Sequence, residues 1–449
     1  MKKIILTLAL AVLSFLSLSA QDITGIWYGV LKVGAMELPM SFNIKKDGQQ
    51  YTSTMSVPMQ SVKDAPVEST TYRNDTLTFE IPQLVFVYKG RVESGSRIKG
   101  LFVQHGQTFS LDLGREKTYE SATRPQTPQP PFPYTATDVT FRNESAGIKL
   151  AGTLTVPEEG ENFPAVVLVS GSGSQNRDEE LFEHKPFLVL ANYLSRNGIA
   201  VLRFDDRGFA ESEGDARTAT TADFATDALA GIRYLKNRKE VNPDKIGVIG
   251  HSEGGIIAFM LAAKEKDVAF VVSLAGSTIK GDSILLLQSE AIGRGYGMTE
   301  EALAVARSLN KSVYDAVQST DDAEELDEKL TAILGTSEQA KSQVRQMTNN
   351  WMRFFLKYDP SADIRNIHIP TLALFGGKDV QVLAEPNAES FKNNIPDTNK
   401  NAEVKVYPGK NHLFQNAVTG LSNEYQLIEE TISTDVLQDI AGWIKKVTK

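Results

Sequence analysis

The spacing of apolar and polar residues changes twice along the chain. Over residues 22–118, short runs alternate between apolar and polar side chains and are separated by turn residues. A period of two is typical of strands that bury one face, and many short strands in a row indicate an antiparallel barrel or sandwich. We predict strands at Ile26 to Lys32, Met40 to Ile44, Tyr51 to Val57, Thr76 to Ile81, Val85 to Tyr88, Ile98 to Gln104 and Phe109 to Leu113.

The first of these runs opens with Gly25-Ile26-Trp27. This resembles the Gly-x-Trp that begins the first strand of lipocalin-like barrels, and the resemblance favours a small barrel as the N-terminal domain. A polar, proline-dense stretch follows over residues 119–135. Such composition is typical of an extended linker between domains.

From residue 136 to residue 449 the pattern is that of a second domain. Apolar runs without alternation predict strands buried on both faces, and segments with a helical period lie between them. Alternating strands and helices imply an α/β fold, a mostly parallel sheet with helices on both faces. The strands are Val166 to Val169, Ala200 to Phe204, Ile246 to Ile249, Ala269 to Leu274 and Leu372 to Phe375, and the helices Phe187 to Arg196, Ala222 to Lys236 and Gly255 to Ala263.

A charged, largely helical stretch over residues 281 to about 360 interrupts this alternation. An insertion between two strands of such a sheet lies naturally over the carboxyl ends of the strands, where ligands bind. We therefore expect a helical lid.

Residues 1–20 have the layout of a secretory signal peptide. Lys2 and Lys3 precede an apolar stretch, and small residues lead to Ala20, although Leu18 stands where a small residue is preferred. The segment is too short to favour a membrane span, and an uncleaved anchor is the alternative. We expect a secreted or periplasmic protein without stable membrane insertion after signal removal.

Composition narrows the chemistry. The 449 residues contain no cysteine, which excludes disulfides, a thiol nucleophile and thiolate–metal sites. The formal net charge of −9, with no long basic run, disfavours nucleic acid as a partner. A nucleophile, if there is one, must come from another residue type.

The segment Gly250-His251-Ser252-Glu253-Gly254 stands between a predicted buried strand and a predicted apolar helix. Gly-x-Ser-x-Gly in this context is the pattern of a nucleophile elbow, a turn so sharp that only glycine fits on either side of the serine. The serine hydroxyl is then exposed at the start of a helix, where the dipole favours negative charge. An ordinary glycine-rich turn is the alternative.

A serine nucleophile needs a base and an acid that orients the base. For a nucleophile on a strand–helix turn, the expected order along the chain is Ser, Asp or Glu, then His. Asp379 follows the predicted strand Thr371 to Phe375, and His412 follows the predicted last strand, Glu403 to Tyr407. Both should lie with Ser252 at the carboxyl edge of the sheet.

The chain has five histidines, His105, His184, His251, His368 and His412. His105 lies in the N-terminal domain, His251 within the elbow, and His368 before the Asp379 strand, on its amino-terminal side. His184 is the rival to His412 as the base, and chain order favours His412.

An acyl-transfer site also needs N–H donors for the oxyanion. The backbone of Glu253, which follows the nucleophile, supplies one. The glycine- and serine-rich loop at 170–178 should supply the other, at Ser172 with Gly173 as second choice. A phosphate-binding loop is disfavoured because no Lys-Ser or Lys-Thr pair opens a helix there.

The charged segment 203–208, Arg-Phe-Asp-Asp-Arg-Gly, follows another predicted strand. Its charges could touch substrate, but a structural ion pair that fixes the loop is the interpretation we favour.

Residues 136–449 resemble the α/β-hydrolase superfamily, most closely its bacterial esterases and serine aminopeptidase-like members with a helical lid. The resemblance implies a Ser252–His412–Asp379 triad, an acyl-enzyme, and neither cofactor nor metal. The cysteine nucleophile of the dienelactone-hydrolase branch is absent, and Ser170-Gly171-Ser172-Gly173 replaces the His-Gly-Gly-Gly of many lipases, which leaves the oxyanion donor open. The motifs that carry the resemblance are Gly250 to Gly254, Asp205-Asp206-Arg207-Gly208, Gly376-Gly377-Lys378-Asp379 and Asn411-His412.

Three functions are compatible with these residues. The first is hydrolysis of small carboxylic esters, and the second is cleavage of short peptides. A peptidase should carry an acidic anchor for the substrate amine, for which the acidic run 321–325 is a candidate, although it reads more simply as a solvated helix start. The third is a non-catalytic binding protein, which a complete triad disfavours. The sequence leaves acyl specificity and oligomeric state open.

Overall fold

The computed structural model describes residues 21–33, 36–48, 50–57, 62–82, 86–104, 107–117 and 123–449. The expected signal segment 1–20 lies outside the described residues, as do His105 and the first residue, Val85, of one predicted strand. The chain divides into two compact units, residues 1–120 and residues 121–449.

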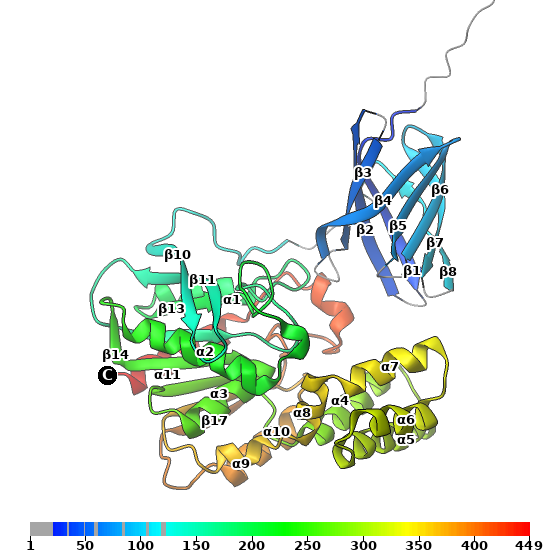
Figure 1. The fold of residues 1–449 in the computed structure, drawn as a ribbon. Coiled ribbons are helices and arrows are strands. Elements are labelled where there is room, and N and C mark those ends of the chain that lie inside the picture. Colours follow the sequence, from blue (N-terminus) through cyan, green and yellow to red (C-terminus); the bar gives the residue numbers. More distant parts are fainter. Residues whose placement is uncertain are drawn as a thin grey trace, which may run out of the picture. The chain divides into compact units, whose positions relative to one another are not determined.

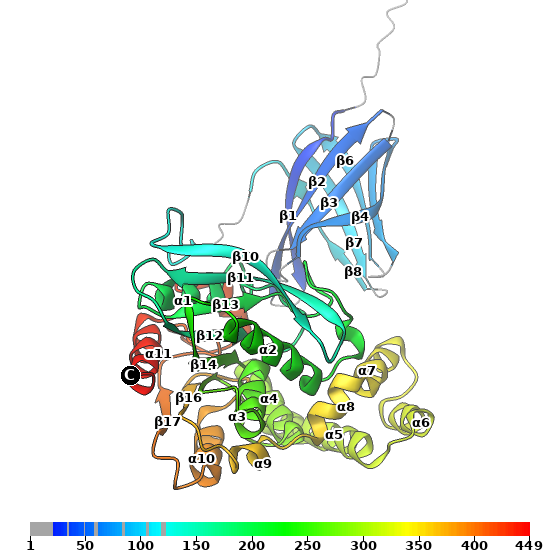
Figure 2. The same ribbon diagram turned by 60° about the vertical axis from the view of Figure 1, so that its left-hand side comes forward.

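The first unit is a closed antiparallel β-barrel (Figure 2). Strands β1 to β7 each pair with the next one, and the two-residue β9 pairs with both β7 and β1, which closes the ring. The predicted barrel is thus confirmed. The strands are β1 (Gly25–Val33), β2 (Met36–Asp47), β3 (Gln50–Val57), β4 (Val62–Arg73), β5 (Thr76–Ile81), β6 (Phe86–Ser94), β7 (Arg97–Gln104), β8 (Gln107–Ser110) and β9 (Leu113–Gly114).

Two details of the barrel differ from the sequence prediction. The run Phe109 to Leu113 is split, because β8 and β9 pair with different parts of β7. The long strand β4 was not predicted, since its sequence, VKDAPVESTTYR, lacks an alternating apolar face. Its extended conformation is instead set by backbone pairing with β3 on one side and β5 on the other.

The barrel interior is filled by alternate side chains of the strands. Phe42 stacks on Phe79 with ring centroids 4.5 Å apart, and Tyr88 lies 5.6 Å from Phe79. At the start of β1, Trp27 is fully buried, donates its Nε1–H to a backbone oxygen at 2.8 Å, and carries the Arg115 guanidinium 3.8 Å above its ring. These contacts give the unit a packed aromatic core.

The second unit contains an eight-stranded sheet in the order β10-β11-β13-β12-β14-β15-β16-β17. The strands from β12 onward are parallel, and β10 and β11 form an antiparallel hairpin at one edge. That hairpin was not predicted. The strands are β10 (Tyr134–Asn143), β11 (Ile148–Pro157), β12 (Phe163–Val169), β13 (Ala200–Phe204), β14 (Val241–His251), β15 (Phe270–Leu274), β16 (Thr371–Gly376) and β17 (Ala402–Tyr407).

Helices cover both faces of this sheet (Figures 1 and 2). One apolar cluster joins one face to α2, α3, α9 and α10, and a second joins the other face to α1 and α11. The α/β fold predicted from the alternation is therefore confirmed. The helices are α1 (Pro186–Ser195), α2 (Thr221–Lys236), α3 (Glu253–Lys264), α9 (Pro360–Ile364), α10 (Ala384–Asn394) and α11 (Thr434–Val447).

Between β15 and β16 the chain forms a group of helices beside the sheet, drawn from yellow-green to yellow in Figure 1. These helices have an apolar cluster of their own. They are α4 (Gly281–Gly295), α5 (Glu300–Ser319), α6 (Ala323–Leu334), α7 (Glu338–Thr348) and α8 (Asn350–Lys357). In the described part of the chain, none of the helices is both long and apolar enough to cross a bilayer.

The first described residues of the proline-dense stretch, 123–127, pack on the rest of the second unit. The guanidinium of Arg124 donates to the backbone oxygens of Phe182, Gln426 and Ile428 at 2.8 to 3.2 Å. The Gln126 amide hydrogen-bonds to backbone groups near residue 432. Residues 123–127 are thus held by the α/β unit.

Candidate active site

Ser252 stands at the sharp turn between β14 and α3. Its backbone angles, φ 53° and ψ −114°, are strained for a residue with a side chain. A Cβ on Gly250 would lie 1.8 Å from the Gly254 oxygen, and one on Gly254 would lie 2.0 Å from the Val169 oxygen. The glycines are therefore required by the tight passage between helix and strand, and the geometry is that of a nucleophile elbow.

Asp379 and His412 come together on the loops that follow β16 and β17. The Nδ1 atom of His412 lies 2.7 Å from Oδ2 of Asp379, and both side chains are buried. The other Asp379 oxygen accepts the backbone N–H groups of Gln381 and Val382 at 2.7 and 2.9 Å. Because a carboxylate accepts, His412 Nδ1 carries the proton, which leaves Nε2 as the basic ring nitrogen.

Ser252 is joined to the His412 loop through its neighbour. The Nε2 atom of His251 lies 3.0 Å from the backbone oxygen of His412, and the two imidazole rings are 4.8 Å apart. Among the described residues, no hydrogen bond links the Ser252 hydroxyl to the His412 ring itself. Such bonds are often long in substrate-free enzymes and shorten when substrate is bound.

The remaining described histidines are placed differently. His184, the rival to His412, is fully buried and lies 2.9 Å from both the Thr431 hydroxyl and the Tyr425 backbone oxygen. Burial lowers its pKa to about 4. His368 is exposed and precedes β16. His184 is therefore part of the packing of the unit, and the structure pairs only His412 with Asp379 among these histidines.

The glycine- and serine-rich loop lies directly against Ser252. A Cβ on Gly171 would be 3.2 Å from the Cβ of Ser252. The Gly171 N–H is already bound to Oε1 of Glu179 at 2.8 Å, whereas Ser172 lines the same cavity as Ser252. Gly173 has φ +94°, with nothing near its missing Cβ. Of the two donor candidates in the loop, Ser172 lines the Ser252 cavity and Gly173 does not.

The charged segment after β13 forms buried ion pairs. Arg207 binds Asp227 at 2.6 Å, Asp205 binds Arg177 at 2.6 Å, and Arg203 binds Asp178. The interpretation of this segment as structural ion pairs is confirmed for these three residues. Asp205 and Arg203 anchor the loop that carries the glycines, whereas Arg207 is joined to α2.

Asp206 has a different environment from its neighbours. It accepts the Ser170 hydroxyl at 2.7 Å and the Gln175 N–H at 2.8 Å, and burial raises its pKa to about 8. It thus ties both ends of the glycine-rich loop to the end of β13.

A cavity of about 80 Å³ opens beside Ser252. Half of its twelve lining residues are apolar and half are polar, and helix α8 of the inserted group contributes Trp351 and Phe355, whose rings stack 5.0 Å apart. The Trp351 Nε1–H donates to the Glu253 carboxyl at 2.7 Å, and burial raises the pKa of Glu253. The residues that line the cavity are Ser172, Ser252, Glu253, Ile256, Ser277, Ile284, Leu285, Gln288, Trp351, Phe355, Gln381 and Val382.

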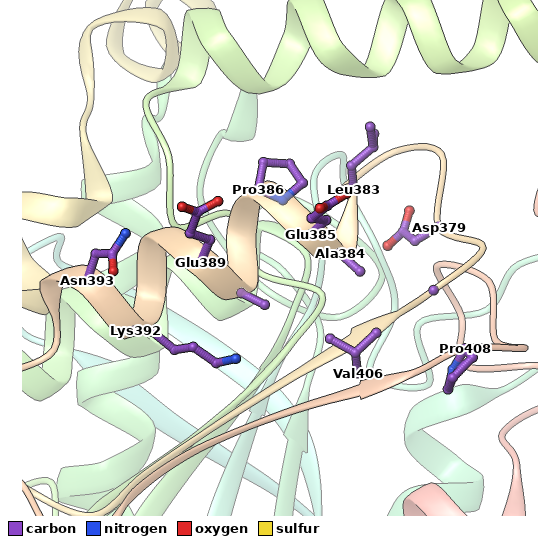
Figure 3. Close-up of a pocket in the computed structure, with 12 residues that line it drawn as sticks. Asp379, Leu383, Ala384, Glu385, Pro386, Glu389, Lys392, Asn393, Val406 and Pro408 are labelled. Carbon is purple, nitrogen blue, oxygen red and sulfur yellow. The ribbon is translucent and has the colours of Figure 1, made fainter.

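A larger hollow of about 740 Å³ lies along α10 (Figure 3). Glu385 and Glu389 on α10 form one side, and Val406 and Pro408 at the end of β17 form the other. Asp379 borders it, but Ser252 and His412 do not. The smaller cavity is therefore the one in which a substrate could meet the elbow.

Several residues of the site were missed by sequence reasoning. Glu179 and Trp351 reach the elbow from positions 72 and 98 residues away along the chain. The position of Glu179 just after the glycine-rich loop was a usable signal, whereas nothing in the lid sequence marks Trp351.

In the part of the chain that the structure describes, no cluster of three or more His, Asp or Glu side chains could hold a metal ion.

The comparisons with known proteins agree with this architecture. Residues 183–417, more than half of the chain, match the family described as serine aminopeptidase, S33. Esterase EstD from Thermotoga maritima is 27% identical over 302 residues, which cover 66% of this chain and 66% of the esterase, just under two thirds of its length. An uncharacterised 31.7 kDa protein from Escherichia coli is 24% identical over 69% of this chain and 99% of its own.

Among solved structures, esterase Pf2001 from Pyrococcus furiosus is 16% identical, with a TM-score of 0.45 over 74% of this chain and 99% of the esterase. The family match and the observed α/β fold with its serine elbow both indicate an α/β hydrolase. The chain belongs to the serine aminopeptidase S33 family of α/β hydrolases and is a hydrolase.

Proposed function

We propose that the chain is a serine hydrolase that cleaves small carboxylic esters through an acyl-enzyme on Ser252. The observation that carries the proposal is the buried Asp379–His412 pair, 2.7 Å apart, at the same sheet edge as the strained elbow of Ser252. A nucleophile, a base and an orienting acid in this arrangement suit acyl transfer.

The reaction follows from the donors and acceptors of the site. Nε2 of His412 takes the proton from the Ser252 hydroxyl as its oxygen attacks the ester carbonyl carbon. The N–H groups of Glu253 and Ser172 stabilise the resulting oxyanion. His412 then gives its proton to the departing alcohol, and a water molecule, activated by the same nitrogen, releases the acid and restores the serine.

Asp379 has an orienting role in this scheme. Its carboxylate holds the proton of His412 on Nδ1 and stabilises the imidazolium that forms when Nε2 takes up a proton. The two backbone N–H groups on its other oxygen keep the carboxylate in place. The charge of Asp379 is thus directed at the ring rather than at the substrate.

Peptide cleavage is the second candidate function, because the matching family is described as serine aminopeptidase. An aminopeptidase needs a carboxylate for the substrate amine. The carboxyl that lines the Ser252 cavity, Glu253, is engaged by Trp351, while Asp321 in the lid pairs with Lys357 and Asp322 caps α6. These occupied acids and the esterase activity named for the Thermotoga maritima relative support the ester reading.

A substrate panel tests the proposal. Short-chain p-nitrophenyl esters and aminoacyl p-nitroanilides are compared on the purified chain, on Ser252→Ala, and on Ser174→Ala, a matched change at an exposed serine of the neighbouring loop. We expect the esters to turn over faster, only Ser252→Ala to abolish turnover, and Ser174→Ala to behave as the parent. Faster turnover of the anilides would assign the chain to the peptidases.

We also propose that the protein is exported to the periplasm or the medium by residues 1–20. Fractionation of producing cells, with N-terminal sequencing of the mature chain, tests this. A mature terminus at Gln21 in the exported fraction is expected, and full-length chain confined to the cytoplasm would contradict it.

A further inference from the structure

A second buried histidine–carboxylate pair lies directly behind Ser252. Nδ1 of His251 is 2.8 Å from Oε1 of Glu179, and Nε2 of the same ring is 3.0 Å from the backbone oxygen of His412. His251 and Glu179 are both buried, with 7% and 3% of their surfaces exposed. Neither belongs to the proposed triad.

The hydrogen bonds define the protonation of His251. A carboxylate oxygen and a backbone carbonyl are both acceptors, so both ring nitrogens must donate. The ring is therefore an imidazolium paired with an ionised Glu179. Burial lowers the pKa of His251, but the charge and hydrogen bond of Glu179 outweigh it, and the pKa is raised.

The pair joins three segments that are far apart in the sequence. Oε1 of Glu179 also accepts the N–H of Gly171 at 2.8 Å, in the loop that abuts Ser252. His251 is the residue before Ser252, and its Nε2 holds the backbone of His412. One ion pair thus fixes the glycine-rich loop, the elbow and the loop of the base.

We propose that Glu179 and His251 are positioning residues for the hydrolase, and that their ion pair holds the His412 backbone and the Gly171 amide in register with Ser252. This rests on the proposed function only in that Ser252 is the nucleophile and His412 its base. It does not depend on whether the substrate is an ester or a peptide.

The charge of the pair has a consequence for His412. The imidazolium of His251 lies 4.8 Å, ring to ring, from His412, and a nearby cation disfavours protonation of a second histidine. The other charged groups that face His251 are Glu179, its own partner, and Asp379, which is hydrogen-bonded to His412. Loss of the cation should therefore move the acid limb of the labelling profile to higher pH.

The test is the rate at which a fluorophosphonate labels Ser252, measured across acidic and neutral pH, because labelling needs the nucleophile and base but no particular substrate. The variants are Glu179→Gln, which can keep hydrogen bonds to Gly171 and His251 but removes the charge, and Glu179→Ala and His251→Gln. His184→Gln, a buried histidine outside the pair, is the control.

We expect Glu179→Ala and His251→Gln to label on the order of ten- to a hundredfold more slowly at neutral pH, because the reacting groups lose their alignment. Glu179→Gln should lose less rate, but the acid limb of its profile should move to higher pH. His184→Gln should keep the parent profile. Circular dichroism verifies that each variant is folded.

Parent-like rates and an unmoved acid limb in folded Glu179→Gln and Glu179→Ala would overturn the positioning role, while ester turnover that depends on Ser252 would leave the proposed function intact. If the parent labels at Ser252 but prefers anilides, the ester proposal fails and the variants still decide the role of the pair. Absence of labelling at Ser252 in the parent would overturn both.

Discussion

The interiors of the barrel and of the α/β unit are built from different chemistry. Apart from Ser53, the buried side chains among the described barrel residues are apolar or aromatic. The α/β unit adds buried charges to its apolar core, such as Arg207 with Asp227 and the histidine–carboxylate pairs at Ser252. Buried ion pairs add little stability compared with apolar packing, so their presence indicates a need for fixed geometry.

The comparison separates two kinds of variant. Substitution of the reacting serine at the carboxyl edge of the α/β sheet should change activity with little change in stability. Substitutions inside the barrel should change stability with little change in the activity of the folded enzyme. The predictions below follow this division, from the largest expected effect to the smallest.

Ser252→Ala should lower kcat by about 10⁵-fold, because the attacking oxygen is removed while the elbow backbone and the cavity remain. Ester hydrolysis of the purified variant and its urea denaturation curve are measured together. A variant with more than a few per cent of parent activity would show that another residue attacks the substrate.

Asp379→Asn should lower kcat by about 10⁴-fold. The amide can present an N–H to Nδ1 of His412, which turns the ring to the tautomer that has no lone pair on Nε2 for the serine proton. A pH–rate profile with near-parent kcat at neutral pH would show that the 2.7 Å contact is structural only.

Phe79→Ala should destabilise the barrel by about 3–5 kcal/mol, because Phe79 is fully buried and stacks on both Phe42 and Tyr88. Urea unfolding followed by near-UV circular dichroism measures the loss. The kcat/KM of the folded fraction should equal that of the parent. A fall in kcat/KM in native conditions would mean that the barrel takes part in turnover.

The buried His184 should make the chain less stable in acid. Its folded pKa of about 4 lies below the ordinary value of 6.5, so the unfolded chain binds the proton first as the pH falls. Stability from this site is complete above pH 6.5 and declines down to about pH 4, by up to about 3 kcal/mol.

His184→Gln should flatten the pH dependence of the unfolding free energy between these two values. His368→Gln, at an exposed histidine, is the control and should leave it unchanged. An identical slope for His184→Gln and the parent would show that the buried ring is not kept neutral.

Tyr88→Phe should stabilise the barrel by about 1 kcal/mol. The Tyr88 hydroxyl is buried with no hydrogen-bond partner among the described residues, and burying an unsatisfied hydroxyl costs free energy. A Cβ on Gly100 would lie 2.3 Å from this oxygen, so the ring fills the space that the glycine leaves. Differential scanning calorimetry measures the change, and a lower Tm would show that the hydroxyl has a partner.

Features encoded in short stretches were predictable from the sequence. The core strands of the α/β sheet and the elbow at Ser252 are signalled by local apolar runs and glycines, and chain order placed Asp379 and His412 on neighbouring loops. The hairpin of β10 and β11 was missed because polar residues interrupt the apolar run in both strands: β10 is the edge strand, and the buried β11 carries threonines and a glycine between its apolar residues.

The contacts that shape the site were not predictable for a physical reason. Glu179 reaches His251, and Trp351 reaches Glu253, through tertiary packing that no periodicity of either segment indicates. The split of the last barrel strand likewise depends on where β7 meets β8 and β9. Contacts between polar side chains that are far apart in the sequence depend on the folded backbone, so no local sequence pattern predicts them.

The most direct measurement of the central claim is peptide mapping of the chain after reaction with a fluorophosphonate. The account predicts a single adduct on the peptide that contains Ser252, absent from Ser252→Ala and slowed by the same factor as ester turnover in Asp379→Asn. An adduct on any other residue, or labelling that survives Ser252→Ala, would contradict it.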